Sequence, residues 1–282
     1  SSNTGLNLKT PLLYPAMLLY ILTPPVVWAL LRRSSSSRLA SADFAIDRVL
    51  LVLMAVPLLL FALLSLGKTI GLHWVLAFVP FALMLAARRL TALGLQKLVV
   101  FFFGFAALHV ALAFAVSRLP LETWRSTSYY PGAVLTFDSR ALVERAEPGD
   151  SLLASDGYSN AVTLGYNLRR YVPVLGAGSG HARHDDILTD WRAHDGRDIT
   201  VLRKTAPRNG EYDAWFRSVR IDSFGHRGAR FWVVRGHGFD YARYRDTVLT
   251  EVRQRYYAVP TWLPLSGCYF CERYFPDQSC TR

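Results

Sequence analysis

Four long apolar runs in the first 118 residues constrain the fold of this chain more than any other feature. They are residues 11–31, 49–66, 71–87 and 98–116. None contains Lys, Arg, Asp or Glu, and each has about the length, roughly 17–25 residues, that a helix needs to cross a hydrocarbon core. Because lipid offers the backbone no hydrogen-bond partners, we expect four transmembrane α-helices. Buried helices of a soluble protein are the alternative, which four such runs in succession disfavour.

Pro24, Pro25, Pro57 and Pro80 lie inside these runs. Proline removes a backbone hydrogen bond from the interior of a helix and kinks it. We therefore expect bent helices in a bundle, where neighbouring helices satisfy the freed backbone groups.

The positive charge is concentrated in the loops between the runs. Residues 1–118 carry a net charge of +8 and residues 119–282 a net charge of +3. Basic residues gather after the first and third runs, at Arg32, Arg33, Arg38, Arg48, Arg88, Arg89 and Lys97. The positive-inside rule assigns these two loops to the cytoplasm, and the N-terminus, the 67–72 loop and everything after Arg118 to the outside. This distribution orients helices and gives no reason to expect a nucleic-acid partner.

Residues 119–282 alternate between strand-like and helix-like stretches. Strands are predicted at 151–155, 171–175, 199–204 and 230–235, and helices at 160–168, 185–194, 212–219 and 241–257. Such alternation predicts βαβ units and a largely parallel sheet. The expected fold is therefore a membrane α-helical region of four transmembrane helices (1–118), followed by a soluble α/β domain on the periplasmic or extracellular side (119–282).

The three cysteines, Cys268, Cys271 and Cys280, all lie near the C-terminus. A zinc site would need a fourth ligand, and no His follows His237. In an exported domain a disulfide is the favoured alternative, with the pairing left open. We therefore assign no metal ligand and no cofactor.

Two further clusters have both a functional and a structural reading. The glycine-rich run 176–180 follows a predicted strand but matches no phosphate-binding motif, so a surface turn is favoured. His181, His184, Asp185 and Asp186 could bind a metal, although a helix-capping run is favoured.

His109 lies inside the fourth apolar run. A neutral imidazole bonded to a neighbouring helix is favoured there over a functional group.

The most informative stretch is residues 65–80, at the short outer loop before the third run. Lys68 is a point charge that can bind a phosphate, and His73 can donate a hydrogen bond or transfer a proton. Trp74 prefers the headgroup zone of a bilayer. We expect His73 to begin a helix whose free N–H groups favour an anion. Together these groups suit a lipid phosphate; the alternative is simple interfacial anchoring.

This stretch, with Lys68, His73 and Trp74 ahead of Pro80, resembles the late outer loop of the GT-C glycosyltransferases. It is most similar to the bacterial relatives of protein O-mannosyltransferases (glycosyltransferase family 39) and of aminoarabinose transferases. Further similar segments are residues 156–161, 164–168, 184–188 and 195–198. The resemblance implies an enzyme of the bacterial inner or plasma membrane that uses polyprenyl-phosphate-linked sugar donors, whose phosphate Lys68, His73 and Trp74 would contact.

The chain departs from that family in lacking its many further membrane helices and its first large outer loop, which holds the catalytic carboxylate. We therefore expect the chain to correspond to the C-terminal part of such a glycosyltransferase, without the catalytic carboxylate. The upstream part of the same polypeptide and the lipid bilayer are its expected partners. The alternative is a non-catalytic, membrane-anchored periplasmic module that binds a partner or a polysaccharide. The sugar and the acceptor stay open.

Overall fold

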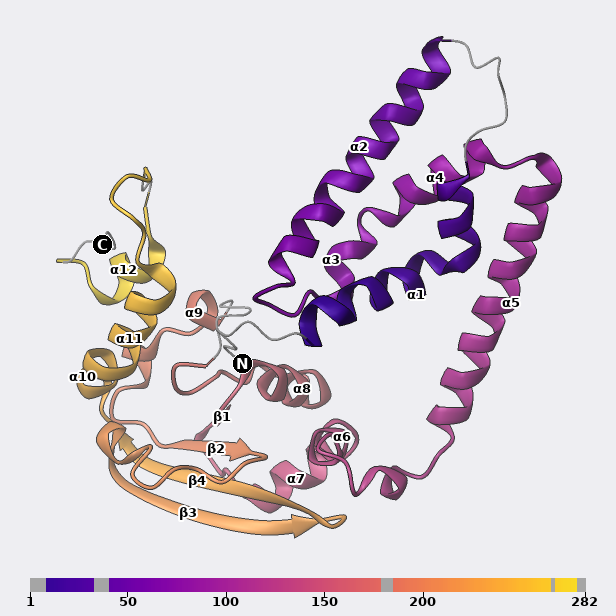
Figure 1. Cartoon of the computed structure of the whole chain (residues 1–282). Coiled ribbons are helices and arrows are strands. Elements are labelled where there is room, and N and C mark those ends of the chain that lie inside the picture. The colour runs from indigo at the N-terminus through magenta and orange to yellow at the C-terminus, as the bar shows by residue number, and fades with distance from the viewer. Residues whose placement is uncertain (1–8, 33–40, 179–184, 265–266, 278–282) are drawn as a thin grey trace. The chain divides into compact units, whose positions relative to one another are not determined.

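The computed structural model describes residues 9–32, 41–178, 185–264 and 267–277 (Figure 1). The chain divides into two compact units, Ser1–Arg118 and Leu119–Arg282. The first is named the membrane unit here and the second the α/β unit, and each is described by itself.

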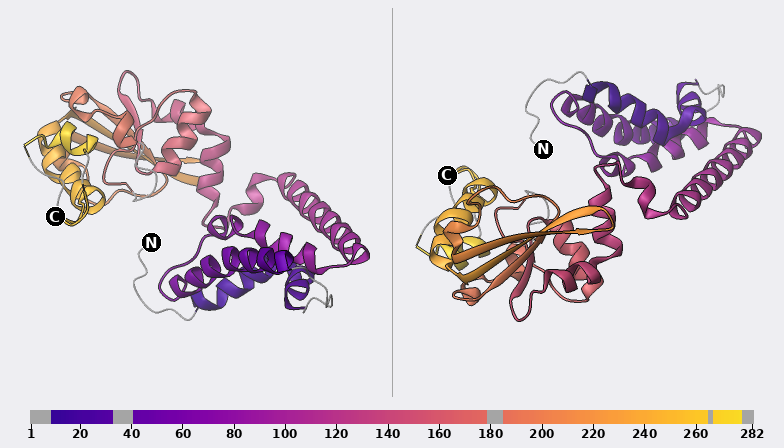
Figure 2. Two further views of the ribbon diagram at one scale, coloured as in Figure 1. Left: turned by 90° about the horizontal axis from the view of Figure 1, so that it is seen from above. Right: turned by 90° about the horizontal axis from the view of Figure 1, so that it is seen from below.

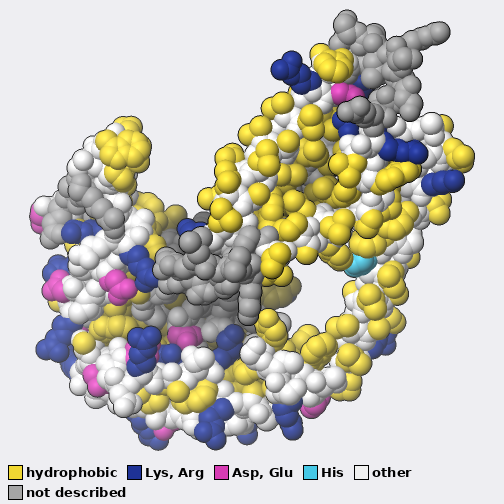
Figure 3. Space-filling view, viewed as in Figure 1, with side chains coloured by type: hydrophobic (Ala, Val, Ile, Leu, Met, Phe, Trp, Pro, Cys, Tyr) yellow, Lys and Arg dark blue, Asp and Glu magenta, His cyan; other side chains and the backbone are white. Residues whose placement is uncertain are grey.

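The membrane unit is helical throughout its regular structure. Its helices are α1 (Lys9–Leu31), α2 (Ser41–Leu64), α3 (Leu72–Leu76), α4 (Val79–Arg89) and α5 (Ala92–Ser117). In the described residues, three spans are long and apolar enough to cross a membrane, at Leu12–Leu31, Phe44–Leu64 and Ala92–Ser117. Many Leu, Val and Phe side chains of these helices are exposed, and apolar side chains cover much of this unit in Figure 3. Apolar surface on this scale is unfavourable in water, so these helices indicate association with a membrane.

The third apolar run is not one helix, which corrects the expectation of four continuous spans. A turn at Ala77 and Phe78 divides it into α3 and α4. Pro80 lies in the first turn of α4, a position at which a helix tolerates the missing N–H. Because Pro80 has no N–H to donate, it cannot form the backbone hydrogen bond that would join α4 to α3. The N–H of Phe78 instead donates to the carbonyl of Val75 at 3.0 Å. By itself α4 is only about 16 Å long, roughly half the thickness of a hydrocarbon core.

The short helices α3 and α4 run antiparallel to α2 (Figure 1). Their positions meet those of α2 in reverse order: Val75 clusters with Phe61, Ala82 clusters with Met54, and Arg88 pairs with Asp47 at 2.6 Å. In α4, Ala82, Leu85 and Ala86 are fully buried. Small residues allow helices to approach closely, and α4 packs against both α1 and α2. Together α3 and α4 therefore retrace the length of α2.

Helix α1 is bent at Thr23, where φ is 65° and ψ is 150°. Pro24 disfavours the helical conformation for the residue before it, and Pro25 lacks an N–H donor of its own. The kink predicted from these two prolines is therefore confirmed. Helix α2 contains Pro57 and still runs as one helix.

The α/β unit combines a sheet with short helices. Its strands are β1 (Leu152–Ser155), β2 (Ile199–Arg203), β3 (Phe216–His226) and β4 (Ala229–Phe239). Its α-helices are α6 (Tyr130–Phe137), α7 (Ser139–Ala146), α8 (Tyr158–Leu168), α9 (Asp185–Leu188), α10 (Tyr241–Tyr244), α11 (Thr250–Val252) and α12 (Tyr269–Tyr274). The 3₁₀ turns are η1 (Leu121–Trp124), η2 (Trp191–His194) and η3 (Asp213–Trp215), and the π-helical turns are η4 (Arg245–Leu249) and η5 (Arg253–Tyr257). The helices predicted at 160–168 and 241–257 are confirmed, whereas the sequence assigned no element to α6 and α7.

The sheet has the strand order β1-β2-β4-β3 and is mixed. Strands β1 and β2 are parallel, but β4 is antiparallel to both β2 and β3. The prediction of a largely parallel sheet was therefore wrong, because a tight hairpin rather than a helical crossover joins β3 to β4. The helix predicted at 212–219 is η3 and the start of β3. The strand predicted at 171–175 contributes an isolated bridge, between Ser155 and Val174.

Helices cover both faces of the sheet (Figure 2). Successive strand residues point to opposite faces. Val201 packs with aromatic residues of η2, α10 and α12, whereas Leu202 packs with apolar residues of α6, α7 and α8. In β4, Val234 packs into the same cluster as Val201, and Val233 packs into the same cluster as Leu202. The sheet therefore separates two apolar cores.

The turn between β3 and β4 is fixed by contacts from the start of the unit. Arg227 and Gly228 have φ angles of 46° and 80°, as in a two-residue type I′ hairpin turn. Asp138, between α6 and α7, accepts hydrogen bonds from Nε2 of His226 at 2.8 Å and from Nε of Arg227 at 2.5 Å. Burial opposes ionisation, but these donors outweigh it, and the pKa of Asp138 is lowered. The hydroxyl of Tyr130 donates to the carbonyl of Arg227 at 2.6 Å.

We predict that Asp138→Asn destabilises the α/β unit at neutral pH but not in acid. Because the folded-state pKa is lowered from 3.8, the carboxylate stabilises the fold above that value, and the effect is lost as the pH falls through the folded-state pKa. Losing a charge-assisted hydrogen bond costs about 1.5–3 kcal/mol. Thermal unfolding of the full chain in detergent from pH 7 down to pH 2, followed by tryptophan fluorescence, measures this, and the destabilisation should shrink as the pH falls below 3.8. Glu144→Gln, at an exposed site on α7, is the control; an equal loss in both variants at pH 7 contradicts the prediction.

Candidate functional site

The three residues predicted to meet a lipid phosphate lie around one turn, between α2 and α3. Lys68 and His73 are exposed, and Trp74 is 47% exposed. The chain reverses tightly, since the N–H of Lys68 donates to the carbonyl of Leu64 at 3.0 Å. The structure therefore brings all three residues to one end of the membrane unit, outside its apolar core.

Buried neighbours hold the backbone of this turn on both sides. Ile70 and Val75 are 7% and 1% exposed and cluster with Tyr14 of α1. The hydroxyl of Tyr14 donates to the carbonyl of Leu58 in α2 at 2.7 Å. Ser65 is buried as well, and its hydroxyl donates to a carbonyl of α2 at 2.6 Å. Three helices thus fix the turn, while the side chains of interest stay accessible.

The imidazole of His73 lies over Gly71 and edge-on to Trp74. A Cβ added to Gly71 would lie 2.6 Å from Cε1 of His73, so glycine makes room for the ring. The rings of His73 and Trp74 are 5.9 Å apart at 84°, and Trp74 also lies 5.9 Å from the ring of Phe61. Helix α3 has only five residues, which corrects the expectation that its N-terminus favours an anion.

The turn is cationic, and the carboxylates of the membrane unit lie far from it. Asp43 and Asp47 are the acidic residues of positions 1–118, and both belong to the start of α2. The stretch of α2 from Asp47 to Leu64 is roughly 25 Å long. The turn can therefore offer an ammonium group, an imidazole and an indole N–H to an anionic headgroup, but no carboxylate base.

His109 in α5 has the structural role that the sequence favoured. Its Nδ1 lies 2.7 Å from the carbonyl oxygen of Phe105, and its Nε2 lies 2.6 Å from the hydroxyl of Tyr20 in α1. Because a carbonyl oxygen only accepts, Nδ1 donates to the carbonyl of Phe105. The predicted bond to a neighbouring helix is confirmed, since Tyr20 belongs to α1.

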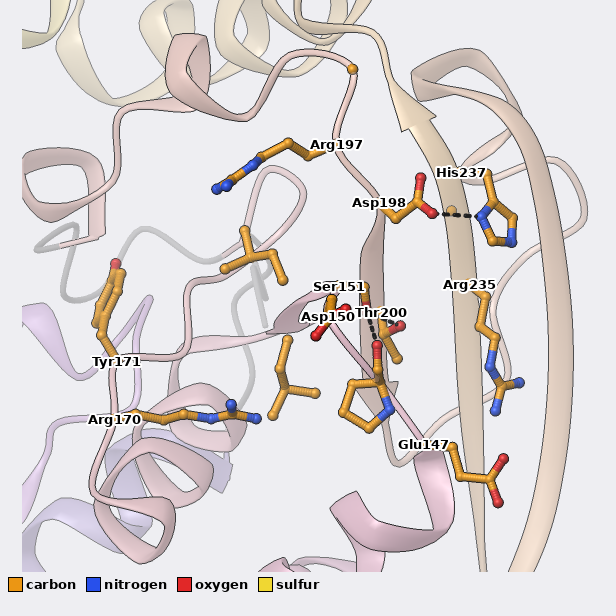
Figure 4. Close-up of a pocket in the computed structure, with 15 residues that line it drawn as sticks. Glu147, Asp150, Ser151, Arg170, Tyr171, Arg197, Asp198, Thr200, Arg235 and His237 are labelled. Atoms are coloured by element: carbon orange, nitrogen blue, oxygen red, sulfur yellow. Dashed lines mark hydrogen bonds and ion pairs between the residues drawn. The ribbon is translucent and has the colours of Figure 1, made fainter.

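A second concave site lies in the α/β unit, where β1 and β2 begin and β4 ends (Figure 4). Its volume is about 790 Å³. It is lined by three carboxylates, three arginines and a histidine, namely Glu147, Asp150, Asp198, Arg170, Arg197, Arg235 and His237. Arg170 and Tyr171 face Asp198, His237 and Arg235 from the opposite side (Figure 4). This site is named the Asp198 pocket.

Asp198 has the best-defined polar contacts of this pocket. It accepts hydrogen bonds from the backbone N–H of Gly238 and from Nδ1 of His237, both at 2.9 Å. The backbone donor first, and then the imidazole, lower the pKa of Asp198. The hydroxyl of Ser151 lies 2.7 Å from that of Thr200, so it is committed to that contact rather than presented to His237 as a nucleophile.

The Asp198 pocket suits a polar ligand with many hydroxyl groups, because donors and acceptors alternate beside an aromatic ring. Tyr171 is 46% exposed, and its hydroxyl is fixed by Asp185 at 2.9 Å and by Thr189 at 2.7 Å. Sequence reasoning missed this pocket because its residues come from well-separated segments. The one signal was the stretch 195–198, which had been noted for its resemblance alone.

The segment 156–161, which also carries part of the resemblance, begins where β1 ends. Oδ2 of Asp156 lies 3.4 Å from Nε of Arg203, the last residue of β2, and its Oδ1 accepts from Asn160 at 3.0 Å. Arg203 is 7% exposed and also donates to Glu211 at 2.9 Å and to the hydroxyl of Tyr212 at 2.8 Å. These partners satisfy the buried guanidinium, so this charge cluster joins strands to helices and has a structural role.

Three of the other candidate residues from the sequence, Cys280, His181 and His184, lie outside the described residues. Cys271 is disulfide-bonded. No group of three His, Cys, Asp or Glu side chains that could hold a metal occurs among the residues with a described position.

The glycine-rich run and the acidic pair after it make structural contacts. Gly176 has a φ of 108°, as turn glycines do, and its N–H donates to the hydroxyl of Tyr244 at 2.9 Å. Asp186 is buried and accepts from the hydroxyl of Tyr257 at 2.7 Å. The φ angle of Gly176 agrees with the favoured reading of a turn. Asp185 and Asp186 lie in the first turn of α9, and their capping role stays a prediction.

Comparison of the chain with protein-family models, curated proteins and solved structures found no match.

We predict that Arg203→Met destabilises the α/β unit by about 3 kcal/mol, because it strips a buried ion-pair cluster of its cation. Arg220→Met is the matched control, since Arg220 is a strand arginine whose pair with Asp222 at 3.0 Å is exposed and contributes less than about 1 kcal/mol. Thermal unfolding of both variants of the full chain measures the difference. Equal melting temperatures for the two variants would show that the Arg203 cluster adds nothing to stability.

Proposed function

We propose that this chain is the C-terminal part of an integral membrane glycosyltransferase that takes a sugar from a polyprenyl-phosphate donor at the outer membrane face. The observation that supports this most is the turn after α2, which exposes Lys68, His73 and Trp74 together beside apolar helices. The same residues carry the resemblance to the GT-C enzymes. A cation, a ring N–H donor and an interfacial indole form a set of groups suited to a lipid phosphate.

The proposed chemistry divides the catalytic work between two parts of one polypeptide. During transfer, the bond from the anomeric carbon to the phosphate oxygen breaks, the acceptor oxygen bonds to that carbon, and negative charge develops on the departing phosphate. Lys68 and His73 would stabilise that charge. A carboxylate base for the acceptor is also expected, and residues 65–80 hold none. The proposal therefore assigns the base to the upstream part and leaving-group stabilisation to this chain.

We also propose that α3 and α4 together form a fourth crossing, as a helix that is broken inside the membrane. Arg88 pairs with Asp47 at 2.6 Å, which supports a common location for the two Arg-rich loops. If α3 and α4 did not cross the membrane, Arg88 would lie on the same side of the membrane as Lys68. Lipid tolerates a broken helix where protein covers it, and Leu85 of α4 is fully buried. The α/β unit then lies outside, on the periplasmic or extracellular face.

We predict that reporters fused after Gly67 and after Leu90 lie on opposite sides of the membrane, because α3 and α4 cross between them. Alkaline phosphatase should be active after Gly67 and after Arg118, and inactive after Leu90. A fluorescent protein that folds only in the cytoplasm should give the reverse pattern. Phosphatase activity at both Gly67 and Leu90 would contradict the fourth crossing and leave three.

We predict that Lys68→Ala weakens polyprenyl-phosphate binding by roughly ten- to a hundred-fold, since a charge-assisted contact contributes ~1.5–3 kcal/mol. Lys68→Arg should retain part of the affinity, because the charge remains with a different geometry. His73→Ala removes a donor and should also weaken binding. The measurement is a titration of the full chain, in nanodiscs of neutral phospholipid, with undecaprenyl phosphate.

Arg118→Ala is the matched control for this titration. Arg118 follows α5 as another interfacial cation, and its guanidinium lies 4.6 Å from the ring centroid of Phe114. Its replacement should change the affinity by less than about two-fold. If Lys68→Ala and His73→Ala behave like Arg118→Ala, these residues are interfacial anchors and the proposed donor site is wrong.

The Asp198 pocket favours a second candidate function, a membrane-anchored module that binds a polysaccharide without catalysis. Its balanced charges and partly exposed Tyr171 suit a neutral glycan better than a phosphate. The two candidates place the ligand on different units. Glycan binding that Asp198→Ala abolishes and Lys68→Ala leaves intact, with no binding of polyprenyl phosphate, would favour the module.

A further inference from the structure

A basic pocket lies at the end of the membrane unit where α1 and α4 end and α5 begins. It is formed by the end of α1, the end of α4 and the first turns of α5, and its volume is about 830 Å³. Four cations line it, namely Arg32, Arg88, Arg89 and Lys97. Within the described part of the chain, no carboxylate belongs to its lining. Its apolar wall includes Trp28 and Phe101.

Contacts within the unit hold two of these cations in place. Arg88 pairs with Asp47 of α2 at 2.6 Å. Nη1 of Arg89 donates to the carbonyl of Leu30, one of the carbonyls that the end of α1 leaves without a helical partner. A guanidinium has five N–H donors, so the contact with Leu30 orients Arg89 and leaves further donors of that group for a ligand.

Arg32 and Lys97 supply charge that no described carboxylate balances. The guanidinium of Arg32 lies 3.7 Å from the ring centroid of Trp28, which holds its flat face against the wall of the pocket. The edge of a stacked guanidinium still points its N–H groups outward. Lys97 is exposed on the second turn of α5. These two side chains are therefore placed for an anion rather than for the fold.

The first turn of α5 adds backbone donors to the same pocket. Thr91 caps this 26-residue helix by accepting from the N–H of Gly94 at 3.2 Å. The preceding N–H groups of the first turn have no helical acceptor, and Leu93 and Gly94 line the pocket. The positive end of the helix dipole thus coincides with the four cations.

We propose that this basic pocket binds the phosphate headgroup of an anionic phospholipid from the leaflet on the Arg-rich side of the membrane. Basic pockets between membrane helices suit such headgroups. The pocket continues into apolar surface, since Leu93 and Phe101 are 61% and 37% exposed and can contact acyl chains. A soluble phosphate would use the cations alone. The site is independent of the proposed glycosyl transfer, because the length of α2, roughly 25 Å from Asp47 to Leu64, separates it from the turn of Lys68.

The test titrates the purified full chain in neutral detergent with phosphatidylglycerol, and separately with phosphatidylcholine that has the same acyl chains. Phosphatidylglycerol should bind at least ten-fold more tightly. Arg32→Ala and Lys97→Ala should each weaken its binding by about five-fold, and the double variant by roughly thirty-fold. Arg32→Lys and Lys97→Arg should keep most of the affinity.

Arg48→Ala is the matched control, since Arg48 is an exposed cation near the start of α2 that does not line the pocket. The affinity of Arg48→Ala for phosphatidylglycerol should equal that of the unmodified chain. A melting curve shows whether each variant is folded. Equal affinity for the two lipids, or equal losses in Arg48→Ala and Lys97→Ala, overturns the proposal.

A further arm of the test adds inorganic phosphate as a competitor. A lipid site should retain phosphatidylglycerol at millimolar phosphate, whereas complete displacement there would assign the pocket to a soluble anion and overturn the lipid. Failure of this site leaves polyprenyl-phosphate binding by Lys68 unaffected, so the two outcomes are distinguishable.

Discussion

Backbone groups in a hydrocarbon core have no water to bond to, and the membrane unit is arranged around this constraint. Its backbone is irregular at Thr23 in α1 and at the turn between α3 and α4. Both places are next to buried residues: Thr23 is itself 1% exposed, and Val75 just before the turn is 1% exposed. Helix α5, by contrast, has Leu98 as its buried residue and contains no proline. Helix breaks therefore occur where protein covers them, and the helix with most exposure has an unbroken backbone.

The antiparallel return of α3 and α4 beside α2 also positions the residues of both proposed sites. Because α3 begins immediately after the turn, Lys68, His73 and Trp74 lie within seven positions of one another on a backbone that three helices fix. Because α4 returns beside α2, its last turn brings Arg88 and Arg89 to the end of α1 and the start of α2. One packing arrangement thus positions cations at both ends of the unit.

The sequence predicted those parts of the fold that depend on local pattern. The spans in α1, α2 and α5 follow from charge-free apolar runs, and β2 from a stretch in which all five residues are buried. Pro80 was harder to interpret, because proline either bends a helix or begins a new one, and tertiary packing decides between them. Strand β3 was missed because polar side chains lie on both of its faces, with Arg217 on one face and Arg220 and Asp222 on the other. The mixed sheet follows from the Arg227–Gly228 hairpin turn, which the sequence did not predict because residues 212–219 were assigned to a helix.

The sites differ in the same respect. The residues of the turn after α2 are neighbours in sequence and could be found, whereas the Asp198 pocket is assembled from distant segments.

Charge is used differently in the two units, and this difference bears on which ligands each can take. In the α/β unit, arginines such as Arg203, Arg227 and Arg235 contact carboxylates within the unit, and the net charge of residues 119–282 is small. Such cations orient strands and turns and have little attraction left for an anion. In residues 1–118, ten basic side chains face two aspartates, so most of the positive charge must be balanced from outside the chain. Phosphates of lipids are the anions available at both surfaces of a membrane. This distribution of charge therefore supports the proposals that anions bind to the membrane unit, at the turn of Lys68 and at the basic pocket, and that the Asp198 pocket takes a polar, uncharged ligand.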